Sequence, residues 1–177
     1  MLLKALLIAI PKGLKLPLVY NCGGYESLET LLLLENIVDI YMPDFKFWNP
    51  SISQELVQAD DYPMIAREAV KEMHRQVGDL LIDERGIAQR GLLLRHLVMP
   101  NESAGTEEIM AFISREISPQ TYVNIMDQYR PCGQAPRHPG INRRIYAEEY
   151  EQALQGAARA GLRRLDQGRI RRTIGWD

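Results

Sequence analysis

Four short runs of apolar residues, each ending in or containing polar side chains, constrain what this chain can fold into. They cover residues 16–21, 37–42, 92–99 and 121–126. Nearly continuous apolar strands are typical of parallel sheets that are buried on both faces, whereas strands with one solvated face alternate apolar and polar residues. The sequence therefore predicts four parallel strands, with polar groups gathered toward one edge of the sheet.

The segments between and around these strands are predicted to be helical, because capping residues, prolines and glycines mark their ends. Residues 78–89 are predicted to form a small β-hairpin, inserted before the third strand, since two short apolar runs flank a turn. Alternation of strand and helix favours right-handed β-α units in one domain, residues 1–166, before a basic, poorly ordered tail at 167–177. The predicted helices cover residues 2–10, 27–35, 51–58 (capped by Ser51), 63–77, 106–117 and 147–160.

The second run continues to residue 46 and ends on a carboxylate and an amine two positions apart. Side chains alternate along a strand, so Met42, Asp44 and Lys46 are expected to share one face. Two charges at the end of a buried strand cost free energy unless they bind each other or a ligand. Since α/β proteins bind ligands at the carboxyl ends of their strands, the pattern indicates either a binding site or an ion pair that closes the strand.

The four strand ends carry the motifs YNCGGY at 20–25, YMPDFK at 41–46, LRHLVMP at 94–100 and NIMDQYRP at 124–131. In their order and spacing these motifs resemble the later strands of radical S-adenosylmethionine (SAM) enzymes. The closest resemblance is to the pyruvate formate-lyase activating enzyme-like branch and related uncharacterised iron–sulfur proteins. The resemblance implies an α/β chain that forms parallel strands three to six of a partial (β/α)6 TIM-like barrel, with the hairpin insertion and a C-terminal helix.

The resemblance implies that charged residues of these motifs contact SAM. Asp44 and Lys46 correspond to a carboxylate and a lysine near the sulfonium and carboxylate of SAM, and near the substrate. Arg95 corresponds to a mid-strand arginine, and an unpaired guanidinium among aliphatic residues would be costly. It is therefore expected to contact Asp44 or a ligand carboxylate, and a purely structural pair between Arg95 and Asp44 is the alternative. His96 is expected to point to the opposite face and to be structural.

Uncharged residues complete the cofactor-binding set that the resemblance implies. Asn21 lies at the end of the first strand, near the ligand. Gly23 is expected in a turn, where the missing Cβ would let the backbone approach a ligand closely. The alternative is an ordinary glycine turn without a ligand. Asn124 and Gln128 are expected on the inner face of the last strand, where contacts to adenine or ribose are reasonable.

The chain departs from the family at the iron–sulfur cluster. Family members hold a 4Fe–4S cluster with the motif C-x-x-x-C-x-x-C, but this sequence has two cysteines, Cys22 and Cys132, and neither lies in such a motif. The chain therefore resembles the C-terminal two-thirds of the enzyme without its cluster-binding start. Catalytic and metal-ligating residues are not assigned, and the sequence holds no phosphate-loop, nucleophile-elbow or zinc-ligand motif.

The resemblance implies that the complete enzyme cleaves SAM reductively and then abstracts hydrogen, with a glycyl-radical or other protein as partner. The chain alone is expected to be inactive, because the cluster supplies the electron. The alternative is a non-catalytic half-barrel that binds a partner or a SAM-like ligand.

Composition excludes several other classes. A formal charge of −2 and a hydrophobic fraction of 46% indicate neither disorder nor binding of nucleic acid. Residues 2–10 are apolar but too short to span a membrane, and a cytoplasmic protein is expected. If the start is missing, this apolar helix and the edge of the first strand should be exposed, which predicts self-association.

Overall fold

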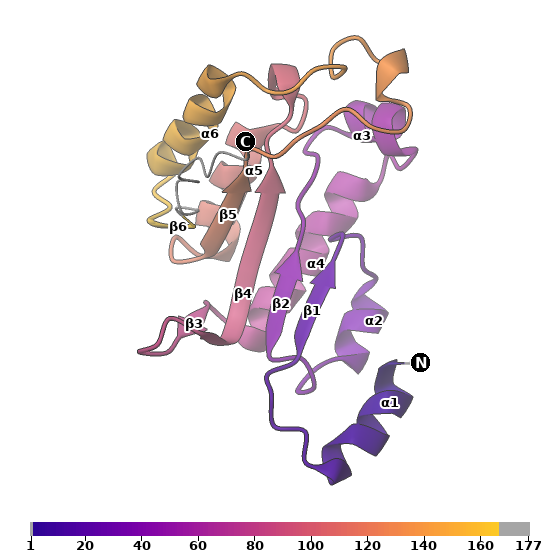
Figure 1. Cartoon of the computed structure of the whole chain (residues 1–177), viewed down its shortest axis with the longest axis vertical. Coiled ribbons are helices and arrows are strands. Elements are labelled where there is room, and N and C mark those ends of the chain that lie inside the picture. Colours follow the sequence, from indigo (N-terminus) through magenta and orange to yellow (C-terminus); the bar gives the residue numbers. More distant parts are fainter. Residues whose placement is uncertain (1, 167–177) are drawn as a thin grey trace, which may run out of the picture.

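A six-stranded, mostly parallel sheet lies at the centre of the computed structural model, which describes residues 2–166 (Figure 1). Strands β1, β2, β4, β5 and β6 follow one another in that order and are parallel, while β3 pairs antiparallel with β4. Since β1 and β6 lie at opposite ends of this order, the sheet is open in the described part of the chain. The strands are β1 (Val19–Cys22), β2 (Ile40–Pro43), β3 (Leu81–Ile82), β4 (Ala88–Leu97), β5 (Tyr122–Met126) and β6 (Arg164–Leu165).

The predicted α/β architecture is confirmed at this level, because the four predicted strands are β1, β2, β4 and β5 and all of them are parallel. A closed barrel wall is not present in the described residues, and the tail predicted at 167–177 lies outside them. Six helices accompany the sheet in the described residues. They are α1 (Leu2–Ala9), α2 (Leu28–Leu33), α3 (Pro50–Val57), α4 (Tyr62–Val77), α5 (Thr106–Phe112, continued by a π turn at Ile113–Ile117) and α6 (Ala147–Arg159).

Local sequence explains where the two central helices begin and end. The cap of α3 is Asn49, whose Oδ1 accepts a hydrogen bond from the backbone N–H of Ser51 at 2.8 Å, so the prediction of Ser51 as the cap was wrong. Pro50 is the first helical residue; it has no N–H that needs a partner, and its ring fixes a helical φ. The cap therefore lies two residues before the predicted one. In α4 the buried positions recur at helical spacing and place one apolar stripe against the sheet, and Gly78 with φ 72° ends the helix.

The observed strands differ from the predicted ones at their ends. β1 begins at Val19 rather than residue 16, and the preceding Leu18 N–H donates to the side chain of Asp39 at 2.8 Å instead of to a strand. The hairpin is continuous with the third strand, since β4 begins at Ala88 and β3 pairs with its first residues. β4 passes close to the preceding loop at Gly91, which has φ 118° and would collide with the backbone of Asp79 if it carried a Cβ.

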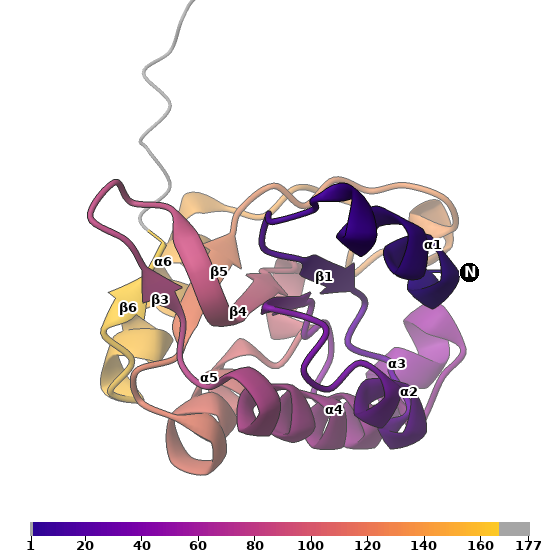
Figure 2. The same cartoon turned by 90° about the horizontal axis from the view of Figure 1, so that it is seen from below.

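Within residues 2–166, helices cover one face of the sheet and leave most of the other uncovered. Figure 2 shows α2, α4 and α5 along a single side of the strands. The side chains of Tyr41, Leu94 and Val123 point into that layer and are fully buried. The alternate positions of the same strands are only partly covered, and we call this side the open face. It carries Met42, Leu93, Arg95, Leu97, Asn124 and Met126, all half-buried.

The first helix contributes little to the core. Leu6 is buried, whereas Leu7 and Ile8 are 75% and 61% exposed. The predicted exposure of this apolar helix is therefore confirmed. β1 also has a strand partner on one side only among the described residues. None of the helices in the described residues has the length and apolar content needed to cross a membrane.

His96 lies in the helix-covered layer, as predicted, and generates a pH dependence of stability. Its ring is fully buried, with Nδ1 2.8 Å from the backbone oxygen of Phe45 and Nε2 2.8 Å from Oγ1 of Thr106. A carbonyl oxygen only accepts, so Nδ1–H donates to Phe45 and the neutral ring accepts the Thr106 hydroxyl at Nε2. Burial lowers the pKa of His96 from 6.5 to about 4.

The free energy of unfolding should therefore fall as pH drops from about 6.5 toward 4, because the unfolded chain then binds a proton that the folded chain excludes. Urea unfolding at a series of pH values between 7 and about 5 measures this slope. His96→Gln should be less stable overall and should lose the slope, while His74→Gln on α4 should retain it. An unchanged slope in His96→Gln would contradict the assignment of a neutral buried ring.

Candidate functional site

Asp44 is the centre of a charged cluster at the carboxyl end of the sheet. It follows β2 directly and forms a parallel bridge with Arg95 of β4. Arg95 donates from Nε to Asp44 Oδ1 at 2.8 Å, and its Nη2 lies 2.6 Å from the same oxygen. Lys46 Nζ lies 2.5 Å from the other carboxylate oxygen, Oδ2. The predicted contact between Arg95 and Asp44 is confirmed, and we call these three residues the Asp44 cluster.

The cluster combines two cations with one carboxylate, so it keeps an excess of positive charge. Its side chains remain partly open to solvent, with 21% of Asp44, 26% of Arg95 and 40% of Lys46 exposed. Both cations retain donors that Asp44 does not use, because a guanidinium has five N–H groups and an ammonium has three. The arrangement can therefore accept an anionic group, such as a carboxylate, beside a carboxylate of its own.

A tight turn and a buried tyrosine hold the backbone of the cluster. Gly24, with φ 78°, lies so close to the backbone oxygen of Asp44 that a Cβ there would collide with it. The hydroxyl of Tyr62 lies 3.0 Å from the oxygens of both Gly23 and Asp44 and accepts the N–H of Lys46 at 2.9 Å. Burial raises the pKa of Tyr62, so its hydroxyl stays protonated and can donate. Tyr62 belongs to a helix more than a dozen residues from each of these partners, so sequence reasoning missed it.

Of the other predicted residues Asn124, Asn21 and Gln128, only Asn124 lies next to the Asp44 cluster. Asn124 pairs in register with Arg95, so it continues the row from Asp44 across the open face. Asn21 pairs in register with Met42 at the edge strand and is exposed. Gln128 is exposed beyond β5, where its Nε2 lies 3.5 Å from the sulfur of Met126. The structure therefore brings Asp44, Lys46, Arg95 and Asn124 together, and leaves Asn21 and Gln128 at the margins.

The cysteines do not form a metal centre in the described residues. Cys22 is half-buried at the end of β1, and burial raises the pKa of its thiol to about 11. A protonated thiol is a poor metal ligand and nucleophile near neutral pH. Cys132 is exposed in the loop after β5. Within residues 2–166, groups of three or more His, Cys, Asp or Glu side chains able to hold a metal ion are absent.

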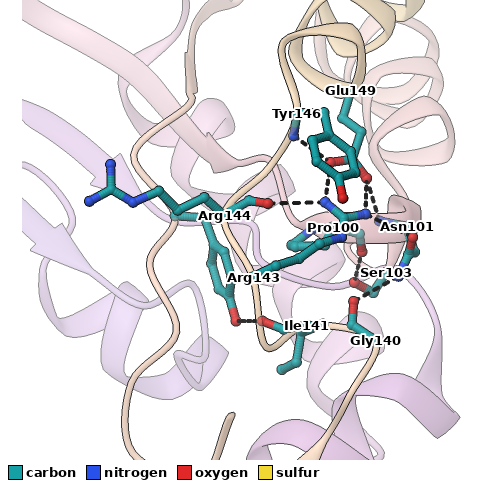
Figure 3. A network of polar contacts seen from close by, with 10 residues as sticks. Pro100, Asn101, Ser103, Gly140, Ile141, Arg143, Arg144, Tyr146 and Glu149 are labelled. Atoms are coloured by element: carbon teal, nitrogen blue, oxygen red, sulfur yellow. Dashed lines mark hydrogen bonds and ion pairs between the residues drawn. The ribbon is translucent and has the colours of Figure 1, made fainter. Parts of the chain in front are cut away.

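A second polar network fastens the long connection between β5 and α6, residues 127–146, which we call the strap. Arg143 of the strap contacts both carboxylate oxygens of Glu149 in α6, at 2.7 and 2.8 Å (Figure 3). Glu149 also accepts the backbone N–H groups of Asn101 and Tyr146, each at 2.7 Å. Asn101 accepts a further bond from Arg143 at 2.9 Å and donates to Gly140 at 2.7 Å. The network joins the strap to the loop that follows β4.

The backbone at this junction is strained. Asn101 and Glu102 are consecutive non-glycine residues with φ of 57° and 52°. Such conformations persist where the surroundings hold them, and here the N–H and both side-chain polar atoms of Asn101 are bound by the network. Asn101 is 42 residues from Arg143 and 48 from Glu149, so no local pattern could have revealed that it joins them. A cavity of about 240 Å³ lies between α3 and the strap, beside the polar contact of His138 Nδ1 with Glu55 Oε1 at 2.8 Å.

Comparison with known proteins gives one informative match. No protein-family model matches the chain, and no solved structure matches it. An uncharacterised protein of the archaeon Methanocaldococcus jannaschii is 37% identical to it over 148 residues, which is 83% of this chain. The chain spans 39% of the length of that relative.

The Glu149 network yields a prediction about stability at low pH. Hydrogen bonds from Arg143 lower the pKa of Glu149 from 4.5 to about 2. The network should therefore stabilise the fold fully above about pH 4.5 and lose this contribution as pH falls toward 2. Glu149→Gln should lower the free energy of unfolding at pH 7 and flatten its decline below pH 4.5. Denaturant unfolding at several pH values measures both effects, and Glu148→Gln, an exposed neighbour, is the matched control. Equal behaviour of the two variants would contradict a stabilising network.

Proposed function

We propose that this chain is the C-terminal part of a radical SAM enzyme that resembles a glycyl-radical activating enzyme, and that the Asp44 cluster contacts SAM. The observation that carries the proposal is the row of Asp44, Arg95 and Asn124 on the open face, at the carboxyl edge of a parallel sheet. This edge is where α/β proteins bind ligands. The proposal includes the finer fold assignment, in which β1, β2, β4 and β5 are strands three to six of a partial (β/α)6 barrel.

The charges of the cluster match those of the proposed ligand. SAM carries a sulfonium, a carboxylate and an ammonium. The carboxylate of Asp44 can offset the sulfonium charge, while the spare donors of Lys46 and Arg95 can hold the carboxylate of the methionine part. The half-buried side chains of Met42, Leu97 and Met126 on the same face offer apolar contact beside the charges. Asn124, and less directly Gln128 and Asn21, would provide amide groups to adenine or ribose.

The iron–sulfur cluster of the family does not fit this chain. A 4Fe–4S cluster is held by cysteine thiolates, whereas Cys22 is a half-buried thiol with a raised pKa and Cys132 lies on a separate loop. We therefore assign no reaction step to this chain alone. Radical formation and hydrogen abstraction, with a glycyl-radical or other protein as partner, would require the segments by which the archaeal relative exceeds the match.

The ion pairs of Asp44 with Lys46 and Arg95 favour a second function. Asp44 is already bound by both cations without any ligand, so the cluster is complete as a structural element. A non-catalytic half-barrel that binds a partner protein or a SAM-like ligand would use the same fold. The two proposals differ in whether the chain gains a reaction when further segments are supplied.

Binding of SAM by the chain is the first test. Calorimetric titration with SAM should give a measurable Kd, and Arg95→Gln and Lys46→Ala should each weaken it at least about tenfold, equivalent to about 1.4 kcal/mol. S-adenosylhomocysteine lacks the sulfonium charge, so Asp44→Asn should reduce the preference for SAM over this analogue. Arg90→Gln, an exposed arginine near the start of β4, is the control and should bind normally. Absence of binding to both compounds would overturn the assignment of the ligand.

Coexpression then separates the two functions. The chain would be produced anaerobically with the part of the archaeal relative that it does not match. Visible absorption of an iron–sulfur cluster and formation of 5′-deoxyadenosine from SAM, both dependent on the two parts together, would support the enzyme. SAM binding by the chain that is unchanged by the added part, without turnover, would favour the binding module.

A further inference from the structure

The N-terminal quarter of the chain separates charges of opposite sign. Residues 1–25 contain three lysines and no acidic residue, whereas residues 26–45 contain five acidic residues and no basic one. Four of the five acids are engaged within the fold: Glu26 accepts the Tyr20 hydroxyl at 3.2 Å, Glu35 pairs with Arg75, Asp39 accepts the N–H of Leu18, and Asp44 lies in its cluster. The fifth, Glu29, is exposed in the first turn of α2.

Helices α1 and α2 present the same surface pattern with opposite charge. In α1 the exposed residues include Leu3, Lys4, Leu7 and Ile8. In α2 they include Leu28, Glu29, Leu32 and Leu33, at the same relative positions. Each helix is anchored by one buried leucine at the equivalent place, Leu6 in α1 and Leu31 in α2. The six leucine and isoleucine side chains of these two sets are between 37% and 75% exposed.

These two surfaces do not pair within one molecule. Figure 2 places α1 and α2 on opposite sides of the edge strand β1. Within residues 2–166 the two faces therefore do not cover each other, and their leucines are available for a contact between molecules. Apolar side chains that are contiguous and uncovered on this scale usually mark an interaction surface.

We propose that the chain forms a symmetric dimer in which α1 of one copy packs against α2 of a second copy. Reciprocal use of two different patches is the arrangement of a twofold interface, where residue i contacts residue j and j contacts i. The apolar side chains form the core of each contact, and Lys4 of one copy faces Glu29 of the other. Lys12 and Lys15 extend the basic side toward Glu26.

Charge complementarity selects a second copy over a membrane surface. An anionic bilayer would attract Lys4, Lys12 and Lys15 but would repel Glu26 and Glu29, so it would not match both surfaces. A second copy satisfies both signs at once, because its own α2 and α1 supply the opposite charges. This inference uses the surfaces of α1 and α2 and no property of the Asp44 cluster.

Sedimentation velocity over a range of protein concentrations measures the dimer. As its concentration rises, the full chain should shift from monomer to dimer without larger species. Leu7→Glu should raise the dimer Kd at least about tenfold, since it places a charge among the apolar side chains of the contact. Leu81→Glu in β3 is the matched control, because Leu81 is a comparably exposed leucine, at 61%, outside the proposed interface. Circular dichroism of both variants verifies that the fold is retained.

Charge reversal provides the decisive test. A basic-to-acidic variant, Lys4→Glu with Lys12→Glu, and an acidic-to-basic variant, Glu26→Lys with Glu29→Lys, should each be monomeric alone. An equimolar mixture should form heterodimers, because every α1 then meets an α2 of opposite charge. A monomeric wild-type chain, dimers that are insensitive to Leu7→Glu, or a mixture that stays monomeric would each overturn the proposal.

Discussion

The structure at the carboxyl end of the sheet depends on the ion pairs of the Asp44 carboxylate. The carboxylate binds Arg95 across the β2–β4 boundary and Lys46 along its own segment, while the Tyr62 hydroxyl holds the backbone oxygens of Asp44 and Gly23 together. The three connections link two strands, one turn and one helix around a single residue. Loss of this carboxylate would leave a guanidinium on a largely apolar face without its partner, which is costly when the charge is partly buried.

One-sided coverage of the sheet decides which residues can act. In β4 and β5 the helix layer buries alternate residues and makes them unavailable, as His96 illustrates next to Arg95. The positions that face the other way remain half-open and hold nearly all the polar groups of the strands. The strap lies at the same carboxyl end of the sheet (Figure 1). Two polar networks are therefore found at this end: the Asp44 cluster on the open face, and the Glu149 network at the start of α6.

Much of the fold was predictable because the pattern of apolar residues is local. Nearly continuous apolar runs predicted the parallel strands, although the expected burial on both faces is found only on the helix-covered face. Helix α4 was predicted almost to the residue because Pro63 and Gly78 bound an apolar stripe of helical spacing. The errors lie at the ends of elements. Ser51 and Asn49 are equally good caps by composition, and side-chain bonds such as that of Asp39 to Leu18 shorten a strand without any local sign. The two-residue strand β6 exists only because β5 offers an edge for it.

The sequence by itself determined the parallel α/β architecture and the shared face of Asp44 and Lys46, since strand alternation and apolar content follow from neighbouring residues. Only the tertiary structure decided that Arg95 binds Asp44, that Asn124 lies in register with Arg95, that Tyr62 holds the turn, and that Asn101, Arg143 and Glu149 form one network. The physical reason is the same in each case. Register between strands and the approach of distant loops are set by the packing of the whole chain, which no single segment encodes.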